Sequence, residues 1–482
     1  MATRSTPSGP DHRPAGTATG TQAAAPAERF PARAAIADAI VATAARSCGR
    51  IVRTARLGAG TSLPGRLADR LGPGFLERRA AALPDGVIVV SGTNGKTTTA
   101  AMIHAMLRAN GMEVVANQSG ANMSGGVVGA FLDAPADARI AVLEVDEGAL
   151  PAITRRVRPR VLVLTNIFRD QLDRFAEPER VGALLASAVD SLPAGATVIA
   201  NADDPVLWEA VRGASPVGFG LTGVADATAE GSAGEPSACP RCGSGLDHVY
   251  RTLAHLGSAR CPTCGWRSAR PSHTGRIVAE GGIRGLVLEE GGAVVTLPLG
   301  GVHNAYNAVA ALATASAMDL PRGEAVAALE RFQPRFGRSE DIEFAGRALW
   351  LGLIKNPAGT GAVLRSIARD PAVGAVVISI NDRAADGRDV SWIWDAEFER
   401  LASSGIPLIP AGRRAEEMAL RLKYAGASPG PAEREPLRAI SSASERCGAG
   451  RVVAVLATYT AMLEARHGLL GRRSARVRDA AA

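Results

Sequence analysis

The residues best suited to chemistry lie in the string Gly92-Thr93-Asn94-Gly95-Lys96-Thr97-Thr98, between an apolar run at 85–91 and a helical pattern that starts at Thr97. Backbone N–H groups of a glycine-rich loop and a helix N-terminus can bind a polyphosphate. Lys96 would then contact the β- and γ-phosphates, and Thr97 would offer its hydroxyl to Mg²⁺. The usual spacing has a glycine where Val90 stands. The alternative is a strand–helix turn with a solvated lysine.

Four of the six cysteines form two close pairs with the spacing of a zinc ribbon: Cys239, Cys242, Cys261 and Cys264. Each pair presents two thiolates on one turn, and two pairs complete a tetrahedron around Zn²⁺. Four protein ligands leave no open position, so a structural zinc is predicted. The alternative is four free buried thiols. The other two cysteines have no such neighbours and are interpreted as ordinary residues.

Alternating strand and helix patterns predict an α/β fold. Buried-strand runs at 85–91, 140–145, 161–166 and 197–201 are separated by helical segments, which favours a mostly parallel sheet covered on both faces. The predicted central domain covers 34–332. Within it, an alanine-rich helix spans 34–57, and the glycine- and serine-rich stretch at about 222–280 carries the ribbon as an insertion.

A second, smaller Rossmann-like α/β domain is predicted at 345–465, after a linker near 333–346 and with strands at 375–380 and 452–456. Residues 1–33 are predicted to form a disordered tail, and 466–482 a frayed basic tail.

Composition narrows the class of function. The 482 residues carry a net charge of +7, without the arginine-rich helix or the aromatic and basic mixture of a nucleic-acid binder. No apolar stretch reaches the about 18 residues of a membrane span, and residues 1–29 lack the apolar core of a signal peptide. A cytoplasmic protein is therefore expected.

The phosphate-loop string resembles that of the Mur ligases and folylpolyglutamate synthases, which join a carboxylate to an amine through an acyl phosphate. Further positions match motifs of this family in the expected order. Glu144 matches a Mg²⁺-binding glutamate, and an Asn-x-x-x-Asp-His-x-Asp motif is matched by Asn166, Asp170 and Asp173. Motifs on the nucleotide side are matched by Asn201 and Asn304, and the arginine of the interdomain linker is matched by Gly337-Arg338. Gln171 replaces the histidine of the Asn/Asp motif. Taken singly, Glu144 could be an ordinary strand-end residue, Asp203 and Asp204 a helix cap, and Asn304 a turn residue.

Within the Mur ligases, the chain resembles the synthetase subunit of the enzyme that amidates lipid II. The strings 353–359, 381–395 and 414–423 carry this resemblance. It implies a Mur ligase central domain and ATP- and Mg²⁺-dependent phosphorylation of the α-carboxyl of D-isoglutamate. Ammonia from a GatD-like glutaminase subunit then gives D-isoglutamine. The resemblance implies a reaction at the inner face of the plasma membrane, where the lipid carrier lies. Asp389 is implied to orient the catalytic histidine of that partner; the alternative is a turn-capping aspartate.

Two other functions fit some of these residues. One is a folylpolyglutamate synthase-like or other Mur-type ligase that uses an amino acid; the ribbon and the string 386–392 count against it. A UDP-sugar substrate is also not expected, because the chain before residue 86 is shorter than the about 100 residues of a typical domain. The other function is a non-enzymatic zinc-ribbon scaffold, which intact Lys96, Thr97 and Glu144 argue against.

Overall fold

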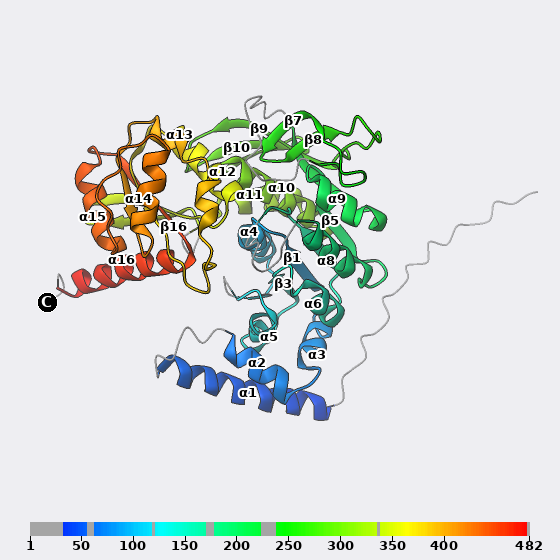
Figure 1. Cartoon of the computed structure of the whole chain (residues 1–482). Coiled ribbons are helices and arrows are strands. Elements are labelled where there is room, and N and C mark those ends of the chain that lie inside the picture. Colours follow the sequence, from blue (N-terminus) through cyan, green and yellow to red (C-terminus); the bar gives the residue numbers. More distant parts are fainter. Residues whose placement is uncertain are drawn as a thin grey trace, which may run out of the picture.

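The computed structural model describes residues 32–54, 62–117, 121–169, 178–222, 238–334 and 338–479. These residues form three N-terminal helices, a central α/β domain and a C-terminal α/β domain (Figure 1). In that view the C-terminal domain, coloured yellow to red, lies beside the central domain, and α1 to α3 lie beneath the central domain. The predicted tail at 1–33 lies almost wholly outside the described residues.

The central domain is built on a nine-stranded sheet with the order β11-β10-β9-β6-β5-β4-β1-β3-β2. The pairs from β2 through β9 are parallel, and only β9–β10 and β10–β11 are antiparallel. The predicted mostly parallel sheet is confirmed. The strands are β1 (Gly86–Ser91), β2 (Val114–Ala116), β3 (Ile140–Glu144), β4 (Val161–Leu164), β5 (Thr197–Asn201), β6 (Val217–Thr222), β9 (His273–Glu280), β10 (Leu286–Glu290) and β11 (Ala293–Leu297).

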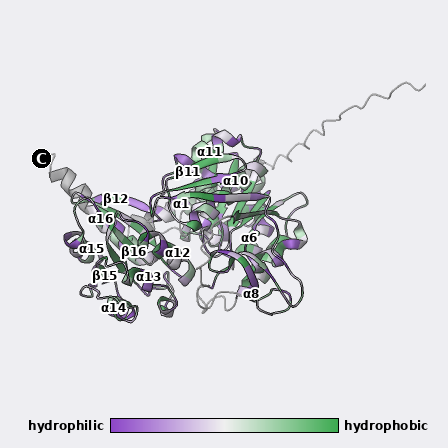
Figure 2. Cartoon of the chain, turned by 90° about the horizontal axis from the view of Figure 1, so that it is seen from above, coloured by the Kyte–Doolittle hydropathy of each residue, from purple (hydrophilic) through white to green (hydrophobic). Residues whose placement is uncertain are grey.

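Helices cover both faces of this sheet, which explains why the inner parallel strands are apolar along their length. One face packs against α4 (Lys96–Ala109), α10 (Val302–Ala317) and α11 (Arg322–Glu330). The other packs against α5 (Ser124–Leu132), α6 (Leu150–Val157), α8 (Pro178–Asp190) and α9 (Pro205–Val211), which is followed by the 3₁₀ turn η1 (Arg212–Ala214). Figure 2 shows hydrophobic residues, in green, along these strands.

The N-terminal helices α1 (Ala32–Thr54), α2 (Leu63–Leu71) and α3 (Phe75–Ala81) cover the α5 side of the central domain. Helices α2 and α5 cross at glycines: a Cβ on Gly65 would lie 1.9 Å from the Gly125 carbonyl oxygen. Glycine is therefore required for this close approach. Among the described helices, none combines the length and the apolar character needed to cross a bilayer.

The C-terminal domain has a five-stranded sheet with the order β12-β13-β16-β14-β15, in which only β12–β13 is antiparallel. Its strands are β12 (Glu340–Phe344), β13 (Arg347–Leu353), β14 (Val373–Ser379), β15 (Leu408–Ala411) and β16 (Val452–Ala457). Its helices are α12 (Pro357–Ala368), η2 (Ser391–Trp394), α13 (Glu399–Ala402), α14 (Ala415–Tyr424), α15 (Pro436–Arg446) and α16 (Tyr459–Asp479).

The limits of this domain differ from the predicted 345–465. Strand β12 already belongs to its sheet, and α16 continues to Asp479 through most of the stretch predicted as a frayed tail. An ion pair connects the two elements that the predicted limits cut off or shortened: the Arg466 guanidinium of α16 lies 2.8 Å from the Glu340 carboxylate of β12. This contact between distant residues cannot be read from local sequence pattern.

The ribbon lies between β6 and β9 and contains the antiparallel hairpin β7 (Asp247–Leu253) and β8 (Leu256–Arg260). The predicted insertion at about 222–280 was too long, because β9 is a strand of the main sheet, paired in parallel with β6. Polar and glycine residues at the start of β9 hide its strand character. Residues 223–237 lie outside the described part of the chain.

Candidate active site

The predicted phosphate loop connects β1 to α4 as expected. Gly92 and Gly95 both have positive φ angles, 122° and 84°, which favour glycine. A Cβ on Gly95 would also lie 2.2 Å from the Asn307 Oδ1 of α10. The α4 N-terminus therefore sits directly against α10, and its N–H groups lie at the edge of a cavity of about 400 Å³ between the two domains.

Lys96 is buried at the first turn of α4, where its ammonium donates to the Gly92 carbonyl and lies 3.0 Å from the Glu147 carboxylate. Burial alone would lower the pKa of Lys96, but the charges of Glu147, Glu144 and Asp146 raise it. Burial likewise opposes ionisation of Glu147, but Lys96 and Lys355 hold its pKa below the usual range. Both groups are thus charged. Glu147 was not predicted, although the acid-rich string 144–147 could have suggested it.

Thr97 and Glu144 are brought together as predicted. The Thr97 hydroxyl donates to Glu144 Oε2 at 2.6 Å, and Asn122 Nδ2 donates to Oε1 at 3.2 Å. The Asn117 side chain fixes the Glu144 backbone through two hydrogen bonds, of 2.8 and 2.9 Å. Hydroxyl and carboxylate oxygens at one cavity edge suit Mg²⁺, which prefers oxygen ligands. The pair fits the predicted Mg²⁺ position.

Asn166 supports the phosphate loop. Its Oδ1 accepts from the Asn94 N–H at 2.8 Å, and its Nδ2 donates to the Asn94 carbonyl at 3.1 Å. The backbone N–H of Phe168 also donates to the Thr93 hydroxyl. Thr93, Asn94 and Thr98 line the cavity, as does Asn166 itself.

Asn304 lines the cavity from the first turn of α10. Its Nδ2 donates to the Gly300 carbonyl at 2.8 Å, and its Oδ1 accepts from Asn307 Nδ2. Asn307 in turn accepts from the Thr99 hydroxyl of α4. Asn304 is therefore part of a hydrogen-bonded connection between α10 and the phosphate-loop helix.

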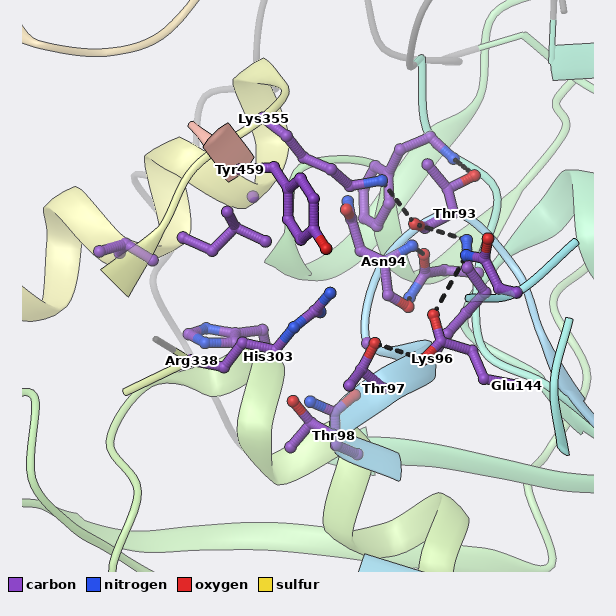
Figure 3. A pocket seen from close by; sticks show the side chains of 18 of the residues that line it. Thr93, Asn94, Lys96, Thr97, Thr98, Glu144, His303, Arg338, Lys355 and Tyr459 are labelled. Carbon is purple, nitrogen blue, oxygen red and sulfur yellow. Dashed lines mark hydrogen bonds between the residues drawn. The ribbon is translucent and has the colours of Figure 1, made fainter. Parts of the chain in front are cut away.

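The C-terminal domain completes the cavity with side chains that sequence reasoning missed. The Lys355 ammonium donates to the Thr93 carbonyl at 3.1 Å, and Asn356 Nδ2 donates to Asn94 Oδ1 at 3.0 Å. Figure 3 shows Lys355 and Tyr459 on one side of the loop and Arg338 with His303 on another. The string 353–359 contains Lys355 and Asn356 and carries part of the family resemblance, but it does not by itself predict a role for either side chain.

Arg338, which was predicted to bind the nucleotide, lines the same cavity. Burial lowers the pKa of its guanidinium, while the Glu144 charge opposes this. The cavity therefore has three cationic side chains. Lys96 comes from the central domain, Lys355 from the C-terminal domain, and Arg338 from the segment between them. Its predicted neighbour Gly337 lies outside the described residues, as do Asp170, Gln171 and Asp173.

Asn201 does not line the cavity, and its predicted nucleotide contact stays a prediction. Its Oδ1 accepts from the Asp203 N–H, and Asp204 caps α9 by accepting from the N–H groups of Val206 and Leu207. The helix-cap alternative therefore holds for Asp204. Burial raises the pKa of Asp203 to about 6, against hydrogen bonds from the Leu221 N–H and the Tyr306 hydroxyl that lower it.

Asp389 is exposed, lies outside the cavity, and stands two residues before the start of η2. Its Oδ1 accepts from the Ser391 N–H at 2.8 Å, and this hydrogen bond lowers the pKa of the carboxyl group. The turn-capping interaction is thus present. Its exposed position also leaves the carboxylate accessible to another protein.

The four ribbon cysteines converge, with all their sulfur atoms within 4.8 Å of one another. Cys239 and Cys264 have sulfurs 3.6 Å apart, and those of Cys242 and Cys261 are 3.5 Å apart. Four ligands at the Zn–S distance of about 2.3 Å would be separated by roughly 3.8 Å, so the set fits a tetrahedral Zn²⁺. Hydrogen bonds with Ser244 lower the pKa of Cys242 to about 6 and favour its thiolate. Against a hydrogen bond from the Trp266 backbone, burial and the neighbouring cysteine sulfurs raise the pKa of Cys264 to about 12.

Two family models match the chain. Residues 90–236 match the Mur ligase middle domain, and residues 353–462 match the MurT ligase C-terminal domain. The first includes the phosphate loop, and the second includes Lys355, Asn356 and Asp389.

Among curated proteins, the chain is 34% identical over 369 residues to the lipid II isoglutaminyl synthase (glutamine-hydrolyzing) subunit MurT of Staphylococcus aureus, covering 76% of this chain and 83% of that protein. It is 34% identical over 450 residues to the same subunit of Streptococcus pneumoniae, covering 87% and 95%.

Solved structures share the fold at low identity. A pseudomurein peptide ligase type C from Methanothermus fervidus has a TM-score of 0.61 at 22% identity, covering 81% of this chain and 79% of that one. The folylpolyglutamate synthase of Mycobacterium tuberculosis, complexed with ADP and AMPPCP, has a TM-score of 0.57 at 17% identity, covering 83% and 92%.

Proposed function

We propose that this chain, which belongs to the MurT family, is the ligase subunit of a glutamine-hydrolysing lipid II isoglutaminyl synthase. It would use ATP to convert the α-carboxyl of D-isoglutamate in the stem peptide of lipid II into an amide. Ammonia would come from a GatD-like glutaminase subunit. Because lipid II is a membrane lipid, we propose that the reaction occurs at the inner face of the plasma membrane.

The observation that carries this proposal is the set of three cations around one cavity. Lys96 begins the phosphate-loop helix, Lys355 comes from the C-terminal domain, and Arg338 comes from the segment between the domains. Phosphoryl transfer gathers negative charge from ATP and from the acceptor carboxylate, so fixed cations stabilise its transition state. A cavity between two domains can hold the nucleotide and the acceptor together.

The proposed chemistry has two steps. A carboxylate oxygen of the stem peptide attacks the γ-phosphorus of ATP, the bond to the β-phosphate oxygen breaks, and ADP leaves. The nitrogen of ammonia then attacks the acyl carbon, the carbon–oxygen bond to phosphate breaks, and phosphate leaves as the nitrogen loses a proton. Lys96 would bind the transferring phosphoryl group, and Lys355 and Arg338 would orient the anionic acceptor.

Thr97 and Glu144 would hold Mg²⁺, which supplies charge neutralisation and alignment of the phosphates when bound. In the described structure, the 2.6 Å hydrogen bond between the two side chains keeps their oxygens together at the loop. Asn117 and Asn122 keep the Glu144 carboxylate in place. Zn²⁺ at the four cysteines would have a structural role, because no ligand position is left open.

Asp389 is proposed to complete the active site of the partner glutaminase. An exposed carboxylate fixed by the Ser391 N–H can accept from a histidine on another protein and hold it in one tautomer. The ligase cavity does not include Asp389. Ammonia release and ligation would thus occur at different places in the complex.

Reconstitution tests the function. The purified chain and its partner glutaminase are mixed with lipid II, ATP, Mg²⁺ and glutamine, and ADP and amidated lipid II are measured. Equal amounts of the two products are expected. Transfer of an amino acid to the same substrate, without amidation by ammonia, would instead favour an amino-acid ligase.

A further inference from the structure

The tip of the ribbon hairpin is buried inside the central domain. The turn between β7 and β8 is formed by Ala254 and His255, and both flanking residues are buried, Leu253 at 4% and Leu256 at 0% exposure. Hairpin turns usually lie at the protein surface. Leu253, Ala254 and Leu256 belong instead to the same apolar cluster as α4, α10 and the main sheet.

Both ends of the ribbon are attached to the segment that contains α9. At the tip, the Gly257 N–H donates to the Asp203 carbonyl at 2.9 Å, and the Thr252 hydroxyl is hydrogen-bonded to the Tyr306 hydroxyl of α10. At the cysteine end, Trp266 Nε1 and Arg241 Nε both donate to the Glu209 carboxylate of α9. The position of the tip is therefore determined at two separate places.

The tip forms part of the active-site cavity. Leu253 and Leu256 line it together with the apolar side chains of Phe168 and Val181. The Phe168 ring packs edge-on against the His255 ring, with 4.9 Å between centroids. The Phe168 N–H also donates to the Thr93 hydroxyl, so this apolar wall begins next to the phosphate loop.

We propose that this tip is the base-side wall of the nucleotide site, with Leu253 and Leu256 packing against the aromatic base of ATP. The proposal rests on the proposed function, in which the loop at 92–98 binds the phosphates. A nucleotide joins a polyanion to a flat apolar base, and the cavity offers cations and backbone donors beside an apolar wall. Small-molecule sites combine these two kinds of surface.

Binding of ADP and of tripolyphosphate, which lacks a base, tests the proposal. Both are titrated into the purified chain by calorimetry, for Leu256→Ala and for Val249→Ala. Val249 lies on the same hairpin with 72% exposure, outside the cavity, and is the matched control. Leu256→Ala should raise the Kd of ADP about tenfold and leave that of tripolyphosphate unchanged, and Val249→Ala should change neither.

A milder variant, Leu253→Val, removes one methylene group and covers the case in which Leu256→Ala does not fold. It should raise the Kd for ADP about two- to fivefold, with a thermal midpoint lowered by only a few degrees because one buried methylene group is lost. Unchanged ADP binding in folded Leu256→Ala or Leu253→Val protein would overturn the proposal. An equal loss for ADP and tripolyphosphate would also overturn it, and so would a raised KM for lipid II alone. Failure of the unmodified chain to bind either probe would instead contradict the phosphate-loop assignment.

Discussion

Asn94 of the phosphate loop and Asn356 at the start of α12 exchange side-chain hydrogen bonds across the domain boundary. Asn356 Nδ2 donates to Asn94 Oδ1 at 3.0 Å, and Asn94 Nδ2 lies 3.4 Å from Asn356 Oδ1. Asn356 also caps α12, because its Oδ1 accepts from the Gly359 N–H at 2.9 Å. One residue thus starts a helix of one domain and orients the loop of the other.

The substitution Asn356→Asp separates these two roles. Aspartate keeps the cap, because it is as good a helix cap as asparagine, but it cannot donate to Asn94. Amidation should slow about tenfold, corresponding to about 1.4 kcal/mol for a lost positioning contact, while the thermal midpoint changes by only a few degrees. An unchanged rate would show that the contact does not position the loop. Asn356→Ala, which also loses the cap, should lower the midpoint further.

Replacing Lys96 should remove ligation, because the transition state loses a fixed cation. A reduction of about 10³-fold or more in kcat is expected. Lys96→Ala alone also removes the hydrogen-bonded partner of buried Glu147 and leaves it only the charge of Lys355, at a cost of up to about 3–5 kcal/mol. The double variant Lys96→Met/Glu147→Gln removes both charges and should fold better than Lys96→Ala. Full activity in either folded protein would contradict the phosphate-loop assignment.

Zinc should be present at about one ion per chain, and its removal should destabilise the protein. Metal analysis measures the ratio, and calorimetry compares the thermal midpoint with and without a chelator. Cys239→Ser should lower the midpoint, because a structural zinc site contributes folding free energy. The same substitution at Cys48, which lies outside the cluster, is the control. Freshly purified folded protein without zinc would refute the assignment.

The substitution Asp389→Asn should slow amidation that uses glutamine but not amidation that uses added ammonium salt. An amide cannot stabilise the histidine cation of the partner, which in related triads costs on the order of 10⁴ in rate. Glutamine-dependent amidation should therefore collapse, whereas amidation with added ammonium salt should continue in the intact complex. If both reactions fail in a folded complex, Asp389 belongs to the ligase reaction; if neither changes, it is a turn residue only.

Stability should depend on pH through Asp203. Its pKa in the folded protein is about 6, above its ordinary value of 3.8, so the folded state binds this proton more tightly than the unfolded chain does. The resulting stability is complete below about pH 4 and is lost as the pH rises through about 6. The loss is at most about 3 kcal/mol. Asp203→Asn should flatten this part of the pH profile in urea unfolding, relative to the unmodified protein; parallel profiles would exclude the effect.

The phosphate loop, the cysteine cluster and the strands around β1 could be predicted because each depends on local spacing. Lys96 and Thr97 follow directly from such patterns, whereas Glu144 was implied only by the resemblance to the Mur ligases. Lys355 and Asn356 could not, because their function depends on a contact with residues 262 positions earlier in the chain. The nucleotide contact of Asn201 rests on a motif match alone and stays a prediction, because its Oδ1 accepts from the Asp203 N–H in the turn before α9.

The parallel pairing of β6 with β9 limits the ways in which the ribbon could be deleted from this fold. Adjacent parallel strands require a connection that returns to the starting end of the sheet, usually of about a dozen residues or more. The ribbon makes that return here, so it cannot be cut out and replaced by a tight turn. A variant of this protein without the zinc ribbon would need another segment, such as a helix, to connect β6 to β9. That segment would also have to replace the buried hairpin tip.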